Sequence, residues 1–339
     1  MTTTDTGSAP SLRGEIDRLL EGTSVADLRR PAARLTEAYR GAGAVGEPAM
    51  RSAADRLAYV AARMPATFEA TRSVLAELQG RCPRLNPGSL LELGAGPAPG
   101  LWAASEVFAG LSRATHVEID GALADLGRRL LAATPVAARV ESSWRGDDLT
   151  SGGDAIQGAG AHDLVLLGYV LGELPEADCS KVVDEAWGVS REALVIVEPG
   201  TPAGAARVLA ARARLIEQGA AVAAPCPHDE ACPLPAGDWC HFGARLNRSR
   251  AQRLLKGGAL PYEDEKYAYV AVTRTPGIPC VARVLRRPVF EPRRVSLRLC
   301  AAAGLREVTV TRRQRQFYRA VRKLTWGDAW EPPSPELAP

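Results

Sequence analysis

The sequence predicts an α/β fold built on a doubly wound parallel sheet, with helices before it and a second, β-rich region after it. Between Pro87 and Pro199, short apolar runs alternate with helical stretches, as in a parallel sheet covered on both faces. A glycine-rich turn joins the first apolar run to the first of these helices. The chain has 339 residues, of which 46% are hydrophobic, and this is enough for a large buried core.

The first two regions are a helical one and the sheet domain. Residues 1–85 are expected to be helical, because Ile16, Leu19 and Leu20 share one helical face. Residues 86–220 are expected to form the sheet domain. Its strands are expected at Ser89–Leu93, Thr115–Ile119, Asp163–Leu167 and Ala193–Val197, and its helices at Gly100–Phe108, Ala122–Leu131, Cys179–Trp187 and Ala203–Gln218.

The remaining regions are a cysteine-rich segment and a basic, β-rich one. Residues 221–245 hold many prolines, which remove hydrogen-bond donors, so this segment is expected to be neither helix nor central strand. Residues 246–330 are expected to form a separate β-rich region, and 331–339 a disordered tail. The strands of the β-rich region are expected at Tyr267–Thr273, Val281–Leu285, Val295–Leu299 and Glu307–Thr311.

The glycine-rich turn predicts a site for a nucleoside cofactor. Gly94, Gly96 and Gly100 follow a strand and open a helix, so that backbone can approach a ligand and the helix can offer free N–H groups to it. Glu92 ends that strand, and Glu118 ends the next one, where an acid can accept hydrogen bonds from two ribose hydroxyls. Both a dinucleotide and S-adenosylmethionine fit this pattern.

Two details favour S-adenosylmethionine. The order of acid, hydrophobic residue, glycine, any residue, glycine resembles the first motif of class I methyltransferases, and Asp147 and Asp148 fall where that family places an acid near the adenine amino group. The turn has Ala98 where a third glycine often stands, and Pro97 and Pro99 stiffen it. We therefore expect cofactor binding more than turnover.

No side chain is assigned as a catalytic acid or base. The fourth strand lacks the Asn/Asp-Pro-Pro-aromatic signature that resembles exocyclic-amine methyltransferases. Tyr169 and Glu173 follow that strand and could face the cofactor, although a tyrosine at the end of a strand is more often packed in the core.

The clustering of cysteines predicts a metal centre. The chain has seven cysteines, and Cys226, Cys232 and Cys240 lie in one proline-rich segment. In a reducing compartment such a cluster binds metal more often than it forms disulfides. Iron-sulfur clusters are held by thiolates, four for a cubane, and the fourth would be Cys280 or Cys300.

Zinc is the alternative metal. Structural zinc sites usually pair cysteines that are two to four residues apart, whereas five and seven residues separate the cysteines here. His228 or His241 would then complete the ligand set.

The same segment carries a family resemblance. Residues 198–204, the Cys-Pro-His, Cys-Pro-Leu and Asp-Trp-Cys-His-Phe stretches, Arg286-Arg287-Pro288 and residues 318–328 resemble the methyltransferase-like proteins of the small ribosomal subunit, which are ribosome assembly factors. The resemblance covers roughly residues 50–330. It implies a four-iron four-sulfur cluster on Cys226, Cys232, Cys240 and Cys300, the last of these preferred over Cys280 by its place in the family pattern.

The charge distribution predicts contact with RNA. The net charge is only +3, but basic residues, almost all arginine, crowd the stretch from Arg283 to Lys323. Arginine forks and aromatic faces such as those of Phe317, Tyr318 and Trp326 suit unpaired RNA bases, and phosphate contacts supply most of the affinity. The resemblance implies that the partner is small-subunit ribosomal RNA in an assembling subunit.

Two functions are expected from these features. One is an S-adenosylmethionine-dependent methyltransferase acting on small-subunit ribosomal RNA, and the other is an assembly factor that keeps the fold without catalysis. The polar first ten residues and the lack of a long apolar run predict no leader and no membrane span. We expect a cytoplasmic monomer.

Overall fold

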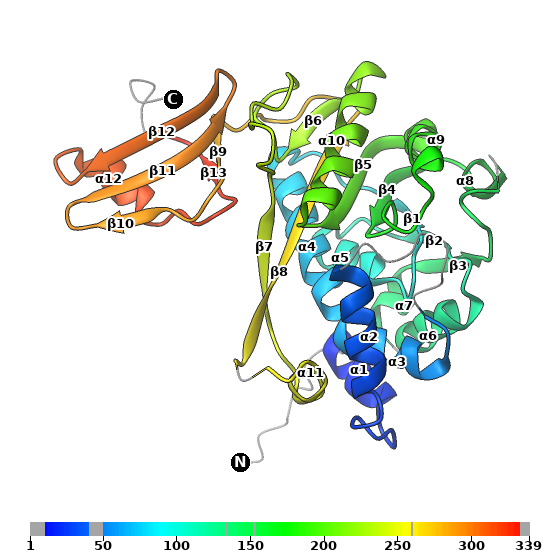
Figure 1. The fold of residues 1–339 in the computed structure, drawn as a ribbon. Coiled ribbons are helices and arrows are strands. Elements are labelled where there is room, and N and C mark those ends of the chain that lie inside the picture. Colours follow the sequence, from blue (N-terminus) through cyan, green and yellow to red (C-terminus); the bar gives the residue numbers. More distant parts are fainter. Residues whose placement is uncertain (1–10, 41–49, 133, 152–153, 259, 333–339) are drawn as a thin grey trace, which may run out of the picture.

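A computed structural model describes residues 11–40, 50–132, 134–151, 154–258 and 260–332 (Figure 1). Within these ranges the chain forms a large mixed sheet with helices on both faces and a smaller sheet beside it. Residues 333–339, which make up most of the expected tail, lie outside the described residues, as do residues 1–10. No helix in the described ranges is both long and apolar enough to cross a membrane.

The large sheet has eight strands in the order β3-β2-β1-β4-β5-β8-β6, with β7 also paired to β8. Strands β1 to β5 are parallel, and β8 runs antiparallel to β5. This order gives a Rossmann-like methyltransferase fold, as the sequence predicts. The strands are β1 Ser89–Leu93, β2 Arg113–Val117, β3 Glu141–Arg145, β4 His162–Gly168, β5 Ser190–Pro199, β6 Ala221–Ala224, β7 Phe242–Asn247 and β8 Tyr262–Thr273.

Two hydrophobic cores cover the two faces of this sheet. Leu90 of β1 belongs to one core, whereas Leu91 and Leu93 belong to the other, because successive side chains of a strand point to opposite faces. The first core includes helices α1 Leu12–Leu19, α2 Arg29–Arg40, α3 Ala53–Ala62, α4 Met64–Arg81, α5 Pro99–Val107 and α6 Gly121–Leu131. The second includes α8 Asp154–Gln157, α9 Glu176–Val189 and α10 Pro202–Glu217; α7 Pro135–Arg139 and α11 Arg250–Lys256 are short helices.

The small sheet is antiparallel and has its own core. Strand β11 pairs with β10 and β9 along one edge and with β12 along the other. Val295, Leu297, Leu299 and Val310 are buried together in this core, against which α12 packs. The elements are β9 Ala282–Val284, β10 Val289–Glu291, β11 Arg294–Ala301, β12 Gly304–Thr311, α12 Arg315–Val321 and β13 Ala329–Trp330.

The sequence placed one strand in the wrong sheet. Tyr267–Thr273 was expected in the separate β-rich region, but it belongs to β8, between β5 and β6 of the large sheet. Periodicity identifies a strand without identifying its neighbours, which here are far away in sequence. The cysteine-rich segment is irregular from Pro225 to His241, and β6 and β7 flank it.

A buried arginine connects the two sheets. Arg283 of β9 is 1% exposed and donates hydrogen bonds to the carbonyl oxygens of Pro225 (2.8 Å) and Gly327 (3.0 Å). It also donates to the carboxylate of Glu77 on α4 (2.8 Å). One side chain therefore joins the small sheet to the cysteine-rich segment and to a helix of the large core.

Replacing this arginine is expected to destabilise the protein strongly. The Arg283→Met substitution would remove this donor from the carbonyls of Pro225 and Gly327 and leave Glu77 paired with Arg81 alone, at a cost of about 3–5 kcal/mol in the free energy of unfolding. Urea unfolding measures this change. The control is Arg287→Met, whose side chain is 74% exposed, and equal unfolding midpoints for the two variants would contradict the role of Arg283.

Candidate functional site

The glycine turn between β1 and α5 is shaped by close packing against β4 and the residues after it. Gly94 has a φ of +62°, and a Cβ atom there would lie 2.3 Å from Cγ2 of Val170. At Gly100 a Cβ atom would lie 2.3 Å from Leu166 and 2.4 Å from Oε1 of Glu92. The turn therefore requires glycine at both positions, as expected for backbone that passes closely over a strand end.

Glu92 has a structural role that the sequence did not predict. Its buried carboxylate accepts hydrogen bonds from the backbone N–H groups of Gly100 (2.8 Å) and Leu101 (3.3 Å) at the start of α5, and it lies 3.1 Å from Nδ1 of His116. The expectation that these helix N–H groups are free for a ligand is wrong, because Glu92 of the same chain already accepts from them.

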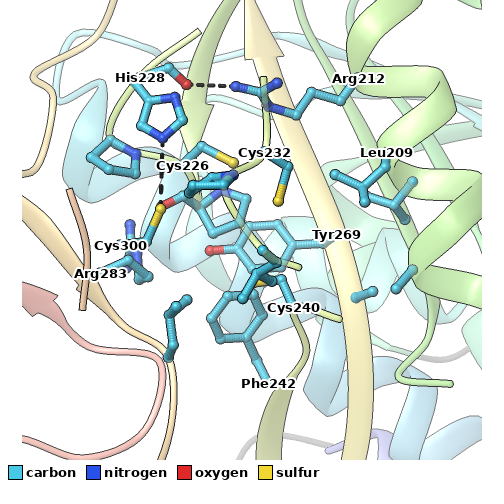
Figure 2. Close-up of a pocket in the computed structure, with 18 residues that line it drawn as sticks. Leu209, Arg212, Cys226, His228, Cys232, Cys240, Phe242, Tyr269, Arg283 and Cys300 are labelled. Carbon is cyan, nitrogen blue, oxygen red and sulfur yellow. Dashed lines mark hydrogen bonds between the residues drawn. The ribbon is translucent and has the colours of Figure 1, made fainter. Parts of the chain in front are cut away.

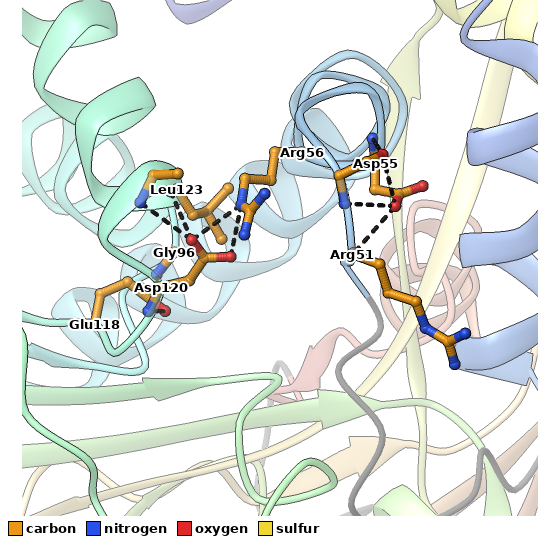
Figure 3. Close-up of polar contacts among 9 residues, drawn as sticks. Arg51, Asp55, Arg56, Gly96, Glu118, Asp120 and Leu123 are labelled. Atoms are coloured by element: carbon orange, nitrogen blue, oxygen red, sulfur yellow. Dashed lines mark hydrogen bonds and ion pairs between the residues drawn. The ribbon is translucent and has the colours of Figure 1, made fainter.

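Glu118 and Asp120 lie just beyond β2, at the carboxyl edge of the sheet (Figure 3). The Glu118 carboxylate accepts hydrogen bonds from the backbone N–H of Gly96 (2.7 Å) and of Asp120 (2.8 Å). Burial raises the pKa of Glu118, although these two backbone donors oppose the shift. Asp120 caps α6 and forms an ion pair with Arg56 of α3 at 2.7 Å, so the N-terminal helices reach this edge.

The two acids after β3 are already engaged by neighbours. Asp147 forms an ion pair with Arg145 at 2.7 Å, and Asp148 accepts hydrogen bonds from the backbone N–H and the hydroxyl of Thr150, both at 2.8 Å. Ile119, between Glu118 and Asp120, is 65% exposed, and the sequence analysis missed it. The exposure of Ile119 beside Glu118 can be known only from the structure, because the sequence does not give solvent exposure.

A polar cluster lies at the end of β4. Tyr169 follows β4 with a φ of +63°, and its hydroxyl lies 3.4 Å from Oε1 of Glu265 on β8. Arg63, between α3 and α4, lies 3.6 Å from the same carboxylate. Burial, and next the charge of Glu265, raise the pKa of Tyr169 well above its ordinary value. Tyr169 is therefore a poor general base near neutral pH.

The four cysteines that the family pattern selects line one cavity (Figure 2). Cys226, Cys232 and Cys240 come from the cysteine-rich segment, and Cys300 comes from β11. The space among the lining residues measures about 600 Å³, including its mouth to solvent. Cys280 is buried but is not among the lining residues.

The cavity holds several thiols and two cationic side chains in a weakly polar setting. Burial, and next the neighbouring Cys226 and Cys232, raise the pKa of Cys240 well above its ordinary value, and the same causes raise that of Cys300 to about 12. Arg212 and Arg283 on the lining oppose such shifts. Thiolates placed this close together would repel one another, and a positively charged group between them would offset that repulsion.

A single metal ion has no ready-made ligand set here. Among the residues that the structure describes, no group of three or more histidine, cysteine, aspartate or glutamate side chains converges closely enough to hold an ion. His228 approaches Cys300, with Nε2 3.6 Å from Sγ, and His241 packs instead against Trp239 and Trp326. The zinc alternative thus gains no support from this geometry.

The basic C-terminal stretch is only partly a free surface. Arg283 is buried, Arg286 and Arg298 pair with Asp238, and Arg294 pairs with Glu291. The aromatic residues expected at an RNA surface are engaged elsewhere. Phe317 and Tyr318 pack against the small core, and Trp326 packs on His241.

The chain matches a known protein family. A family model described as mitochondrial small ribosomal subunit Rsm22 matches residues 53–331. The human ribosome assembly protein METTL17, mitochondrial, is 28% identical over 298 residues, which cover 80% of this chain and 61% of that protein. The chain thus spans less than two thirds of the length of this relative.

Two solved methyltransferases are similar to this chain at low sequence identity. Magnesium protoporphyrin IX methyltransferase from Synechocystis PCC 6803, with bound S-adenosylmethionine, is 13% identical with a TM-score of 0.40, covering 80% of this chain and all of that one. An O-methyltransferase family protein from Burkholderia thailandensis is 14% identical with a TM-score of 0.42, covering 80% and 74% of the two chains.

The match over residues 53–331 shows that the chain belongs to the mitochondrial small ribosomal subunit Rsm22 family.

Proposed function

We propose that this protein is a methyltransferase-like factor that binds S-adenosylmethionine and small-subunit ribosomal RNA during assembly of the small ribosomal subunit. Family membership over residues 53–331 carries this proposal, because the family description names the small ribosomal subunit. The name of the human relative, a ribosome assembly protein, supports the same role.

The cofactor site would lie at the carboxyl edge of the large sheet. The turn from Gly94 to Gly100 brings backbone close to this edge. Glu118 would accept hydrogen bonds from the ribose hydroxyls once its contacts with backbone N–H groups rearrange. The exposed Ile119 would cover the adenine, and Asp147 or Asp148 would accept from its amino group. When bound, the cofactor would supply an electrophilic methyl group.

Two roles remain for the bound cofactor. A methyltransferase would transfer the methyl group to ribosomal RNA, whereas a non-catalytic assembly factor would use cofactor binding without transfer. The second role is favoured by the network at the end of β4, where Tyr169 and Arg63 both contact Glu265. In this network the raised pKa of Tyr169 makes it a poor general base. Tritiated methyl transfer to small-subunit RNA distinguishes the two roles, because only the enzyme incorporates label.

The cysteine cavity would hold a four-iron four-sulfur cluster. A cubane holds its four thiolates at separate corners, so its ligands stand farther apart than those of one ion, and the lack of a single-ion group is compatible with it. Cys226, Cys232, Cys240 and Cys300 all line the same cavity. When bound, the cluster would supply iron–thiolate bonds between the cysteine-rich segment and β11.

Weakening the ribose contact is expected to lower cofactor affinity. The Glu118→Gln substitution keeps the side-chain size but removes the charged acceptor, so the affinity for S-adenosylmethionine should fall about tenfold or more. Isothermal titration calorimetry measures this affinity. Glu307→Gln, an exposed change on β12, should leave it unaltered. An unchanged affinity in Glu118→Gln would place the ribose contact elsewhere.

Protein prepared without oxygen is expected to be brown and to hold about four irons per chain. Cys300→Ser should lower the iron content and the visible absorbance, because a thiolate ligand is lost. Cys280→Ser is the matched control, since Cys280 is equally buried but does not line the cavity. Iron analysis and absorbance measure both variants. A colourless wild-type protein with one zinc would refute the cluster.

RNA binding is expected to depend on arginines near α12. Replacing Arg312, Arg313 and Arg315 with glutamine should weaken binding and reduce the slope of log K against log salt by about 0.7 per lost phosphate contact. Fluorescence anisotropy at several salt concentrations measures the slope. Three exposed arginines elsewhere, Arg30, Arg84 and Arg129, serve as the control set. The same slope in both triple variants would exclude this surface.

A further inference from the structure

Four exposed arginines meet at one end of the small sheet. Arg293 lies in the turn between β10 and β11, and Arg312, Arg313 and Arg315 lie between β12 and the start of α12. The backbone N–H of Arg312 donates to the carbonyl oxygen of Arg293 at 2.8 Å, which joins the two turns. We call these four residues the arginine tip.

The arginine tip carries a local excess of positive charge. The neighbouring Arg294 is neutralised by an ion pair with Glu291 at 2.6 Å. Among the ion pairs of the described residues, none includes a member of the arginine tip. Four guanidinium groups without carboxylate partners favour a polyanionic ligand, because each can contact a phosphate.

An exposed aromatic side chain lies beside the arginine tip. Phe290 of β10 is 56% exposed and pairs with Val295, whose partner on β12 is the buried Val310. Paired side chains lie on the same face of a sheet, so Phe290 lies on the face that carries the small core. It stands on the edge strand, only two residues before the turn that holds Pro292 and Arg293.

This exposure sets Phe290 apart from the other phenylalanines. The chain has five, all within the described residues, and the other four are buried or half-buried. Phe317 of α12, the nearest in sequence, packs against the small core. An aromatic ring held on an edge strand, next to unpaired arginines, is a suitable stacking surface for a nucleobase.

We propose that this end of the small sheet binds a single-stranded segment of RNA, with an unpaired base stacked on Phe290 and the adjoining phosphates on the arginine tip. The inference rests on the proposed RNA-binding function and specifies the form of RNA. Bases inside a duplex already stack on one another, and the narrow major groove of A-form RNA excludes side chains, so only an unpaired base can cover the ring.

The test compares one single-stranded oligoribonucleotide with a duplex of the same sequence. For Phe290→Ala, the affinity for the single strand should fall about tenfold, the usual effect of losing one stacked base, while the salt slope stays constant because no charge is removed. Affinity for the duplex should stay unchanged. Phe290→Trp should bind the single strand as the wild type does, because an aromatic face remains. Fluorescence anisotropy measures each affinity.

Matched controls separate stacking from other effects. Ile278→Ala removes an equally exposed apolar side chain, 58% exposed, away from the arginine tip and should bind both RNAs normally. Equal losses for single strand and duplex, or no loss for Phe290→Ala, would overturn the inference. So would normal RNA binding by Phe290→Ala together with weaker co-sedimentation with small subunits, since Phe290 would then contact a protein. A wild-type chain that binds neither RNA would refute the proposed RNA-binding function itself.

Discussion

The architecture depends on one buried cation, the guanidinium of Arg283. A charge removed from water is tolerated only where acceptors surround it, and here they come from three distant parts of the chain, Glu77, Pro225 and Gly327. Arg283 is also the cross-strand neighbour of Cys300, and it lines the cavity of the four cysteines. The contact that joins the two sheets thus also lowers the electrostatic cost of placing thiolates together.

The position of β8 explains how the cofactor edge and the cysteine cavity share one framework. Strand β8 pairs antiparallel with β5, β6 and β7 (Figure 1). This pairing brings Glu265 to the polar cluster at the end of β4 and Tyr269 to the wall of the cavity. The cysteine-rich segment leaves from β6 and returns through β7, so both of its ends are anchored to the same strand. A loop held at both ends loses less entropy when it closes around a ligand.

Local patterns in the sequence predicted most of the fold and part of the site. The apolar runs of β1, β4 and β5 and the glycine turn are short-range signals, and the structure has them where expected. What failed was non-local: periodicity could not give the neighbours of β8, nor could spacing show that Glu92 accepts from the start of α5. The packing of Phe317, one of the aromatic residues expected on the RNA surface, could not be predicted for the same reason, because it depends on a core that α12 shares with β11 and β12.

Strand β11 connects the two proposed functions of the small sheet. It begins at Arg294 beside the arginine tip and reaches Cys300 at its other end, a distance of about 20 Å for six residues of extended chain. A cluster bound through Cys300 would fix one end of this strand, and RNA at the arginine tip would contact the other. Since β11 also supplies four buried side chains to the small core, its order bears directly on the RNA-contacting turn. Loss of a cluster would therefore weaken RNA contact through the packing of one strand, without any change in the arginines themselves.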